Sequence, residues 1–219
     1  GWLAAAGQDL AGFTAYYRQE FFQDLQTLRV QEGNLYPLAS EHVEAMVNLT
    51  QRLLGRGFAY EKLRSVYFDI SRFKDYGRLS RVDLSKIKVG KTVDLDEYAK
   101  ENPRDFTLLK RAKLGELKKG QFYSTPWGKV RPSWHLECAA MALKHLGETA
   151  DLHVGGVDSV SPHEENENAV FAAATGKPMA QFWLHCERVL KDGRPLKKED
   201  AAYVRDLEAA GFKGEDLRF

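Results

Sequence analysis

Three residues that can bind a metal ion such as zinc lie in neighbouring stretches of the sequence. His163 and Glu167 are four residues apart in a stretch expected to be helical, so both side chains lie on one helix face. Cys138 stands earlier, in a different expected helix. Thiolate, imidazole and carboxylate groups are zinc ligands, and three protein ligands leave a position open for a substrate. The spacing indicates a candidate metal site, although such spacing more often reflects a solvated helix face and a small core cysteine.

A second candidate is the glycine-rich turn formed by Gly155, Gly156 and Asp158, which follows an expected strand. In nucleotide-binding α/β folds, a carboxylate near such a turn accepts hydrogen bonds from ribose hydroxyls. The pattern is too short to be specific, so the residues alone favour a plain glycine turn.

Hydrophobic periodicity predicts the elements that must position these residues. Helices are expected over residues 9–29, 40–54, 134–146, 163–174 and 203–210. Strands are expected over residues 65–70, 151–154 and 182–190, of which the second is predicted to be short and buried. The alternation of strands and helices predicts an α/β sheet.

Composition excludes several classes of protein. The 219 residues are 43% hydrophobic and 29% charged, which is typical of a globular domain. The net charge of +1 gives no general attraction to nucleic acid, so tRNA binding would need a local basic patch. Two cysteines are too few for a disulfide framework and indicate a reducing, cytoplasmic location. No apolar run is long enough to cross a membrane, so no membrane partner is expected.

Several blocks of the sequence, taken in order, resemble the cysteinyl-tRNA synthetases, a class I family. The blocks are residues 66–69, 76–80, 102–106, 131–141, 151–158, 162–167, 173–178 and 183–185. Together they span nearly the whole chain. The resemblance implies a class I, Rossmann-type parallel sheet that is incomplete at its N-terminal half, with a connecting α+β insertion.

The resemblance also implies a division of the chain. Residues 1–29 would be a helix of the catalytic domain, residues 30–125 the connecting region, and residues 126–219 the second half of the Rossmann-type domain. A partial sheet leaves an exposed edge and apolar surface. We therefore expect a homodimer or another partner to cover it.

The site implied by the resemblance selects cysteine. Zinc would be held by Cys138, His163 and Glu167 and would bind the substrate thiol, because a thiolate is a softer ligand than the hydroxyl of serine. Trp134 and His153 would contact the substrate.

The nucleotide would lie beside the cysteine, near the ends of the strands expected over residues 151–154 and 182–190. Its expected contacts are Gly155, Gly156, Asp158, His185 and Lys198. The implied reaction is ATP-dependent activation of cysteine, followed by transfer to tRNA(Cys).

The sequence departs from that family at both ATP motifs. None of the six histidines forms the His-Ile-Gly-His motif of the first half, so an upstream piece is missing or has been lost. The Lys-Met-Ser-Lys-Ser motif is replaced by residues 194–199, where Pro195 stands for one lysine and only Lys198 aligns with the other. Loss of cationic donors to pyrophosphate weakens ATP activation.

Smaller departures lie near the expected site. Glu164 stands where the family has a histidine, Glu187 where it has a glycine, and Val154 where it has another glycine. Three hypotheses stay open. The chain is part of an active synthetase, a degenerate paralogue that binds cysteine or zinc without full ATP chemistry, or a ligase that joins cysteine to a small-molecule acceptor.

Overall fold

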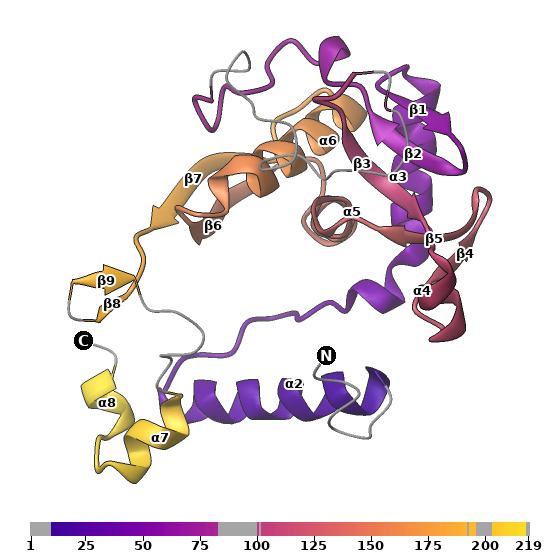
Figure 1. Cartoon of the computed structure of the whole chain (residues 1–219). Coiled ribbons are helices and arrows are strands. Elements are labelled where there is room, and N and C mark those ends of the chain that lie inside the picture. The colour runs from indigo at the N-terminus through magenta and orange to yellow at the C-terminus, as the bar shows by residue number, and fades with distance from the viewer. Residues whose placement is uncertain (1–9, 83–99, 101, 192, 196–202, 218–219) are drawn as a thin grey trace. The chain divides into compact units, whose positions relative to one another are not determined.

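The structure is a computed structural model that describes residues 10–82, 100, 102–191, 193–195 and 203–217. The chain divides into two compact units, one formed by residues 1–36 and 189–219 and the other by residues 37–188 (Figure 1). The candidate metal ligands all belong to the second unit. The domain division predicted from the sequence, with a connecting region over residues 30–125, stays a prediction.

An antiparallel sheet forms one part of the second unit. Its strands follow the order β1-β2-β3-β5-β4. They are β1 (Ala59–Lys62), β2 (Ser65–Phe68), β3 (Phe106–Arg111), β4 (Tyr123–Thr125) and β5 (Gly128–Pro132). The short helical elements around the sheet are η1 (Ala39–Glu41), η2 (Ile70–Arg72) and α4 (Leu114–Lys118). All four residues of β2 are buried, as its β-branched and aromatic side chains favour.

Helix α3 (Val43–Gly55) packs its apolar stripe into the main core. Met46, Leu49 and Leu53 recur at steps of three and four, and each is at most 2% exposed. Burying a side chain of this size contributes roughly 1.5–3 kcal/mol. The same core takes small residues from two further helices, α5 (Trp134–Leu146) and α6 (Glu165–Thr175). Alanines such as Ala139 and Ala173 let these helices approach each other closely.

A strand–helix–strand unit carries the rest of the site. Strands β6 (Ala150–Gly156) and β7 (Ala180–Cys186) pair in parallel, with Leu152 opposite Phe182 and Gly155 opposite His185. The connection between them runs through the π-helical turn η4 (Val160–Glu164) and α6, as a parallel pair requires. This arrangement agrees with the class I α/β fold that the sequence predicts.

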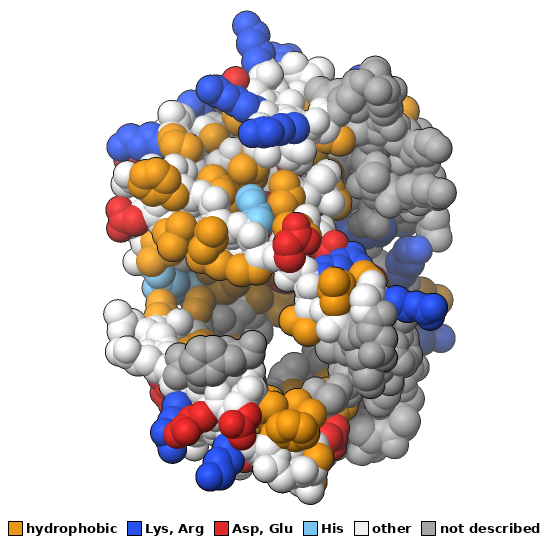
Figure 2. Space-filling view, turned by 90° about the vertical axis from the view of Figure 1, so that its left-hand side faces the viewer, with side chains coloured by type: hydrophobic (Ala, Val, Ile, Leu, Met, Phe, Trp, Pro, Cys, Tyr) orange, Lys and Arg blue, Asp and Glu red, His pale blue; other side chains and the backbone are white. Residues whose placement is uncertain are grey.

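The two faces of the β6–β7 pair differ in character. Leu152, Val154, Phe182 and Leu184 lie on one face, and all four are more than half exposed. The prediction of a buried strand over residues 151–154 was therefore wrong for its apolar side chains, because no described residue covers this face. We call these four residues the β6–β7 apolar face. Figure 2 shows hydrophobic side chains and histidines together on the side where Figure 1 places these strands.

The other unit is mostly helical. Its elements are α2 (Leu10–Thr27), β8 (Leu190–Lys191), β9 (Arg194–Pro195), α7 (Val204–Ala209) and α8 (Gly214–Leu217). Arg205 of α7 pairs with Glu20 of α2 at 3.0 Å, and Arg29 pairs with Glu215. Among the described residues, no helix has the length and hydropathy needed to cross a membrane.

Candidate metal centre

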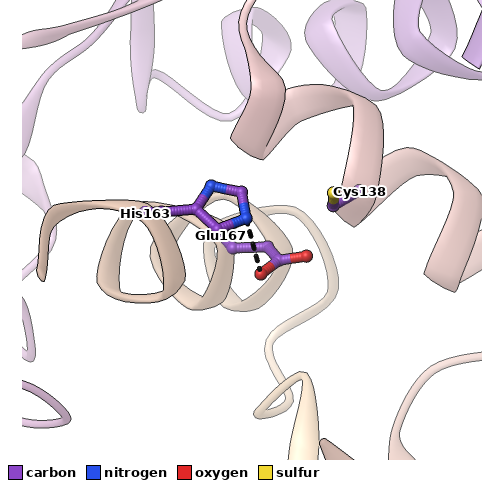
Figure 3. Close-up of side chains that lie close together, drawn as sticks. All are labelled: Cys138, His163 and Glu167. Atoms are coloured by element: carbon purple, nitrogen blue, oxygen red, sulfur yellow. Dashed lines mark ion pairs between the residues drawn. The ribbon is translucent and has the colours of Figure 1, made fainter. Parts of the chain in front are cut away.

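Cys138, His163 and Glu167 come together where α5 faces the start of α6. One ligand atom from each residue lies within 4.8 Å of the others. His163 Nε2 is 3.8 Å from Glu167 Oε2, as the four-residue spacing predicts. Figure 3 shows His163 and Glu167 on one helical stretch and Cys138 on the helix opposite. The structure thus brings together the three residues predicted from the sequence as metal ligands.

Local packing explains how Cys138 reaches this position. The amide of Ser133 donates a hydrogen bond to the carbonyl of Leu108 in β3, at 2.9 Å, and fixes the start of α5 on the antiparallel sheet. Ala139 and Ala140, which follow Cys138, are buried in the core shared with α6. Because these side chains are small, the thiol lies within reach of the facing helix.

One oxygen of the buried Glu167 carboxylate makes no hydrogen bond with the described residues. The Glu167 side chain is 2% exposed, and the oxygen is Oε2. His153 Nε2 approaches Oε2 to 3.3 Å, and this contact raises the pKa of His153 although burial opposes the rise. Nδ1 of His153 and Nδ1 of His163 are also buried without partners in the described part of the chain. A buried charge normally needs a counter-charge or hydrogen bonds, so these atoms suit a bound cation.

The ligands differ in their protonation. Burial, reinforced by the charges of Glu167 and Glu137, raises the pKa of the Cys138 thiol to about 12. Burial lowers the pKa of His163, so its imidazole is neutral at neutral pH, which is the form that binds a metal. A metal that binds here must therefore displace the thiol proton of Cys138.

Aromatic rings border the centre on two sides. Trp134 stacks on His163 with ring centroids 3.6 Å apart, and Trp183 stacks on His153 at 4.2 Å. Trp134 itself is 62% exposed, so it separates the His163 ring from solvent. The two residues predicted to contact the substrate, Trp134 and His153, thus both lie beside the candidate metal ligands.

The residues predicted to bind the nucleotide do not all gather at one place. Gly155 and Gly156 end β6, and His185 of β7 donates from Nε2 to Glu164 Oε2 at 2.6 Å. Asp158 is half exposed and forms an ion pair with Arg188. Lys198 lies outside the described residues.

The burial of Glu164, Glu165 and Asn166 was not predicted. All three are at most 4% exposed at the start of α6. Glu165 accepts hydrogen bonds from the amides of Gly77 and Ser80 at 2.8 and 2.7 Å, and Asn166 accepts one from the Tyr76 hydroxyl. Charged side chains are rarely buried, so periodicity gives no signal for such contacts.

Comparisons with known proteins agree with this structure. The family model described as the tRNA synthetases class I (C) catalytic domain matches residues 4–218. A relative from Methanosarcina mazei named cysteine–tRNA ligase is 47% identical over 216 residues, which are 98% of this chain and 46% of the relative. One with the same name from Chlamydia pneumoniae is 42% identical and covers 96% of this chain and 45% of its own length. The chain thus spans about half the length of the curated relatives it matches.

A solved structure shows the same fold. A Campylobacter jejuni protein named as an arginyl-tRNA synthetase aligns with a TM-score of 0.50 and 12% identity, over 89% of this chain and 34% of that one. At this identity the likeness concerns the fold alone. The family model and the named relatives show that the chain belongs to the cysteinyl-tRNA synthetase family of class I synthetases.

Proposed function

We propose that this chain acts as part of a cysteine–tRNA ligase, which uses ATP to activate cysteine and transfers it to tRNA(Cys). The observation that carries the proposal is the convergence of Cys138, His163 and Glu167 beneath Trp134, in a chain whose relatives bear that enzyme's name. Cysteine, ATP and tRNA(Cys) are therefore the proposed partners.

The residues present fit zinc. One sulfur, one nitrogen and one oxygen donor is a set that zinc accepts, and three protein ligands are typical of a site with a free position. Glu167 Oε2 is a buried acceptor that His153 Nε2 approaches to 3.3 Å but that makes no hydrogen bond with the described residues. When bound, zinc would supply a Lewis acid that prefers the sulfur of cysteine to the oxygen of serine.

The residues around the proposed zinc site would support the selection of cysteine over serine. Glu167 provides the negative charge that attracts the cation, and Trp134 keeps the His163 ring in a fixed plane. A pocket that binds a substrate atom directly discriminates far more strongly than one that only measures size. A separate editing site against serine would then be unnecessary.

A second candidate function is the binding of cysteine or zinc without full ATP chemistry. Two observations favour it. Pro195 takes the place of an ATP-motif lysine, and Asp158, an expected ribose contact, forms an ion pair with Arg188 instead of standing free. A ligase that joins cysteine to a small-molecule acceptor is the third candidate, and the same ATP-motif changes count against it.

Cysteine-dependent exchange between ATP and pyrophosphate tests the first proposal. The zinc-supplemented chain is assayed with cysteine and, as a control, with serine. Exchange with cysteine alone supports the ligase. If exchange is absent while calorimetry still detects cysteine binding, the second candidate is favoured. Loss of both exchange and cysteine binding contradicts both.

Zinc content provides a separate test of the ligand set. Cys138→Ser should reduce the zinc bound per chain, because a hydroxyl replaces the soft donor. Cys186→Ser is the matched control, since Cys186 is also a free cysteine but is exposed and outside the ligand set. Equal zinc content in the two variants would show that Cys138 is not a ligand.

A further inference from the structure

Beside the metal centre, Gly155, Glu164 and His185 form a second cluster that contains none of the proposed ligands. Glu164 is 1% exposed, and its Oε2 accepts a hydrogen bond from His185 Nε2 at 2.6 Å. Gly155 and His185 are direct neighbours across the β6–β7 pair. The cluster therefore joins both strands to the turn that precedes α6.

The missing side chain of Gly155 makes room for the carboxylate. A Cβ atom at Gly155 would lie 1.9 Å from Glu164 Oε1, closer than atoms can approach, and 3.0 Å from its Cδ. Gly155 has no positive φ angle, so its backbone does not itself require glycine. Glycine thus leaves the space that the Glu164 carboxylate occupies, and a larger residue would displace that carboxylate.

The hydrogen bond determines which nitrogen of His185 carries the proton. A neutral imidazole has a single N–H, and the carboxylate of Glu164 can only accept a hydrogen bond when ionised. With the proton on Nε2, the lone pair is left on Nδ1. Nδ1 makes no hydrogen bond with the described residues, and the His185 side chain is 22% exposed. The His185 ring is therefore partly accessible to a ligand.

We propose that Glu164, seated against Gly155, is a positioning residue that fixes His185 as its Nε2–H tautomer and so presents Nδ1 as a hydrogen-bond acceptor to a ligand. The ligand group must then be a donor, such as a hydroxyl or an amine. The identity of the ligand rests on the proposed function, which offers the hydroxyls and amine of adenosine or the amine of cysteine. The tautomer itself does not depend on that function.

Nitrogen NMR of the full chain, labelled with ¹⁵N-histidine and free of metal, tests the tautomer. The pH is set about two units above the ordinary histidine pKa of ~6.5, so that the imidazoles are neutral. His185→Gln assigns the His185 signals. We expect a single Nε2–H tautomer in the unmodified chain and a mixture in Glu164→Ala. A mixture in the unmodified chain, or an unchanged tautomer in Glu164→Ala, would overturn the proposal.

Three further variants separate positioning from general damage. Glu164→Gln keeps an oxygen acceptor without the charge and should preserve the tautomer. Gly155→Ala should disturb it although Glu164 is intact, because the new methyl group displaces the carboxylate. Gly156→Ala is the matched control, since a Cβ there meets nothing within 4 Å, and should leave the tautomer unchanged. If Glu164→Gln behaves as Glu164→Ala, the charge and not the acceptor matters, and the proposal fails.

Calorimetry with adenosine and with cysteine, each alone, identifies the donor group. Loss of one hydrogen bond in Glu164→Ala should weaken binding of the contacting ligand on the order of threefold to tenfold, with recovery in Glu164→Gln. Unchanged affinity for both ligands would refute the ligand contact. Failure of the proposed function would appear elsewhere, as absent zinc binding or exchange in the unmodified chain, and would leave the tautomer result intact.

Discussion

The ring planes of Trp134 and His163 are 11° from parallel, with their centroids 3.6 Å apart. Trp134 lies one helical turn before Cys138 on α5. One helix therefore carries both a proposed metal ligand and the aromatic ring that covers another ligand. A substitution of Trp134 should therefore first alter the orientation of the His163 imidazole.

Removing that ring should weaken metal binding. Residues that orient metal ligands typically contribute tenfold to a hundredfold to affinity. We expect Trp134→Ala to lower zinc affinity on the order of tenfold in a chelator competition assay. Trp134→Phe keeps a flat ring over His163, so its zinc affinity should fall less than that of Trp134→Ala. Equal affinity in the alanine variant and the unmodified chain would contradict an orienting role.

Zinc affinity should rise with pH. The pKa of the Cys138 thiol is raised to about 12, so the thiol holds its proton at neutral pH, whereas the lowered pKa of His163 leaves that ligand already neutral. Each bound zinc then releases one proton, and affinity increases about tenfold per pH unit above neutrality. Affinities measured between about pH 7 and 9 check the slope. A flat profile would mean that Cys138 does not bind as the thiolate.

Acid should destabilise the fold through His135. Burial lowers its pKa to about 4, while its Nε2 donates to the carbonyl of Thr107 at 2.9 Å. Between the ordinary pKa of ~6.5 and the folded value, only the unfolded chain takes up the proton, so stability falls as pH falls through this window. The loss should be on the order of 3 kcal/mol.

His135→Gln tests this link because it keeps a donor for Thr107 but does not titrate. Urea unfolding is compared between about pH 7 and 4. As pH falls through this window, the unmodified chain should lose more unfolding free energy than His135→Gln. Below the folded-state pKa, the difference in unfolding free energy between the two should stay constant. Parallel pH profiles would exclude His135 as a source of the acid sensitivity.

The buried carboxylate of Asp105, just before β3, accepts hydrogen bonds from strand β1 and from the turn η2 that follows β2. Asp105 is 1% exposed and accepts hydrogen bonds from the Ile70 amide at 3.1 Å and the Tyr60 hydroxyl at 2.8 Å. Asp105→Ala leaves the buried amide without an acceptor and should cost about 2–3 kcal/mol of unfolding free energy. Tyr60→Phe removes the hydroxyl that donates to Asp105 but leaves the buried amide with its acceptor, so it should cost less, about 1 kcal/mol. Similar losses in both variants would argue against the buried amide as the cause.

The β6–β7 apolar face should promote association. Parallel strands are normally covered on both faces, and contiguous exposed apolar surface marks an interaction site. We expect the chain to self-associate or to bind a partner there, and expect Phe182→Ser to reduce self-association in sedimentation experiments. Leu114→Ser is the matched control, because Leu114 is also 68% exposed but lies on α4. A chain that sediments as a stable monomer contradicts the expectation.

Sequence periodicity located five helices and three strands, where apolar side chains are spaced regularly, but not the other strands of the antiparallel sheet. The stripe of Met46, Leu49 and Leu53 is buried as expected, and the strand predicted over residues 65–70 is found at Ser65–Phe68. Exposure was harder to predict. Leu152 and Val154 read as core residues, yet whether a strand face is covered depends on residues distant in the sequence.

The candidate site was predictable only in part. The four-residue step between His163 and Glu167 is a local property of a helix, so their proximity follows from the sequence. The approach of Cys138 depends on packing between two helices and came from the family resemblance. The burial of Glu164 against Gly155 could not be predicted from either residue alone, because it requires knowledge of both positions in space.

That contact has an evolutionary consequence. While residue 164 is a glutamate, a side chain at position 155 displaces its carboxylate, so substitutions at position 155 disturb the contact with His185. If residue 164 first becomes shorter, the space opens and alanine or serine becomes acceptable at position 155. The order of the two substitutions therefore decides whether a descendant chain passes through a damaged intermediate, and the two positions should change in a correlated manner.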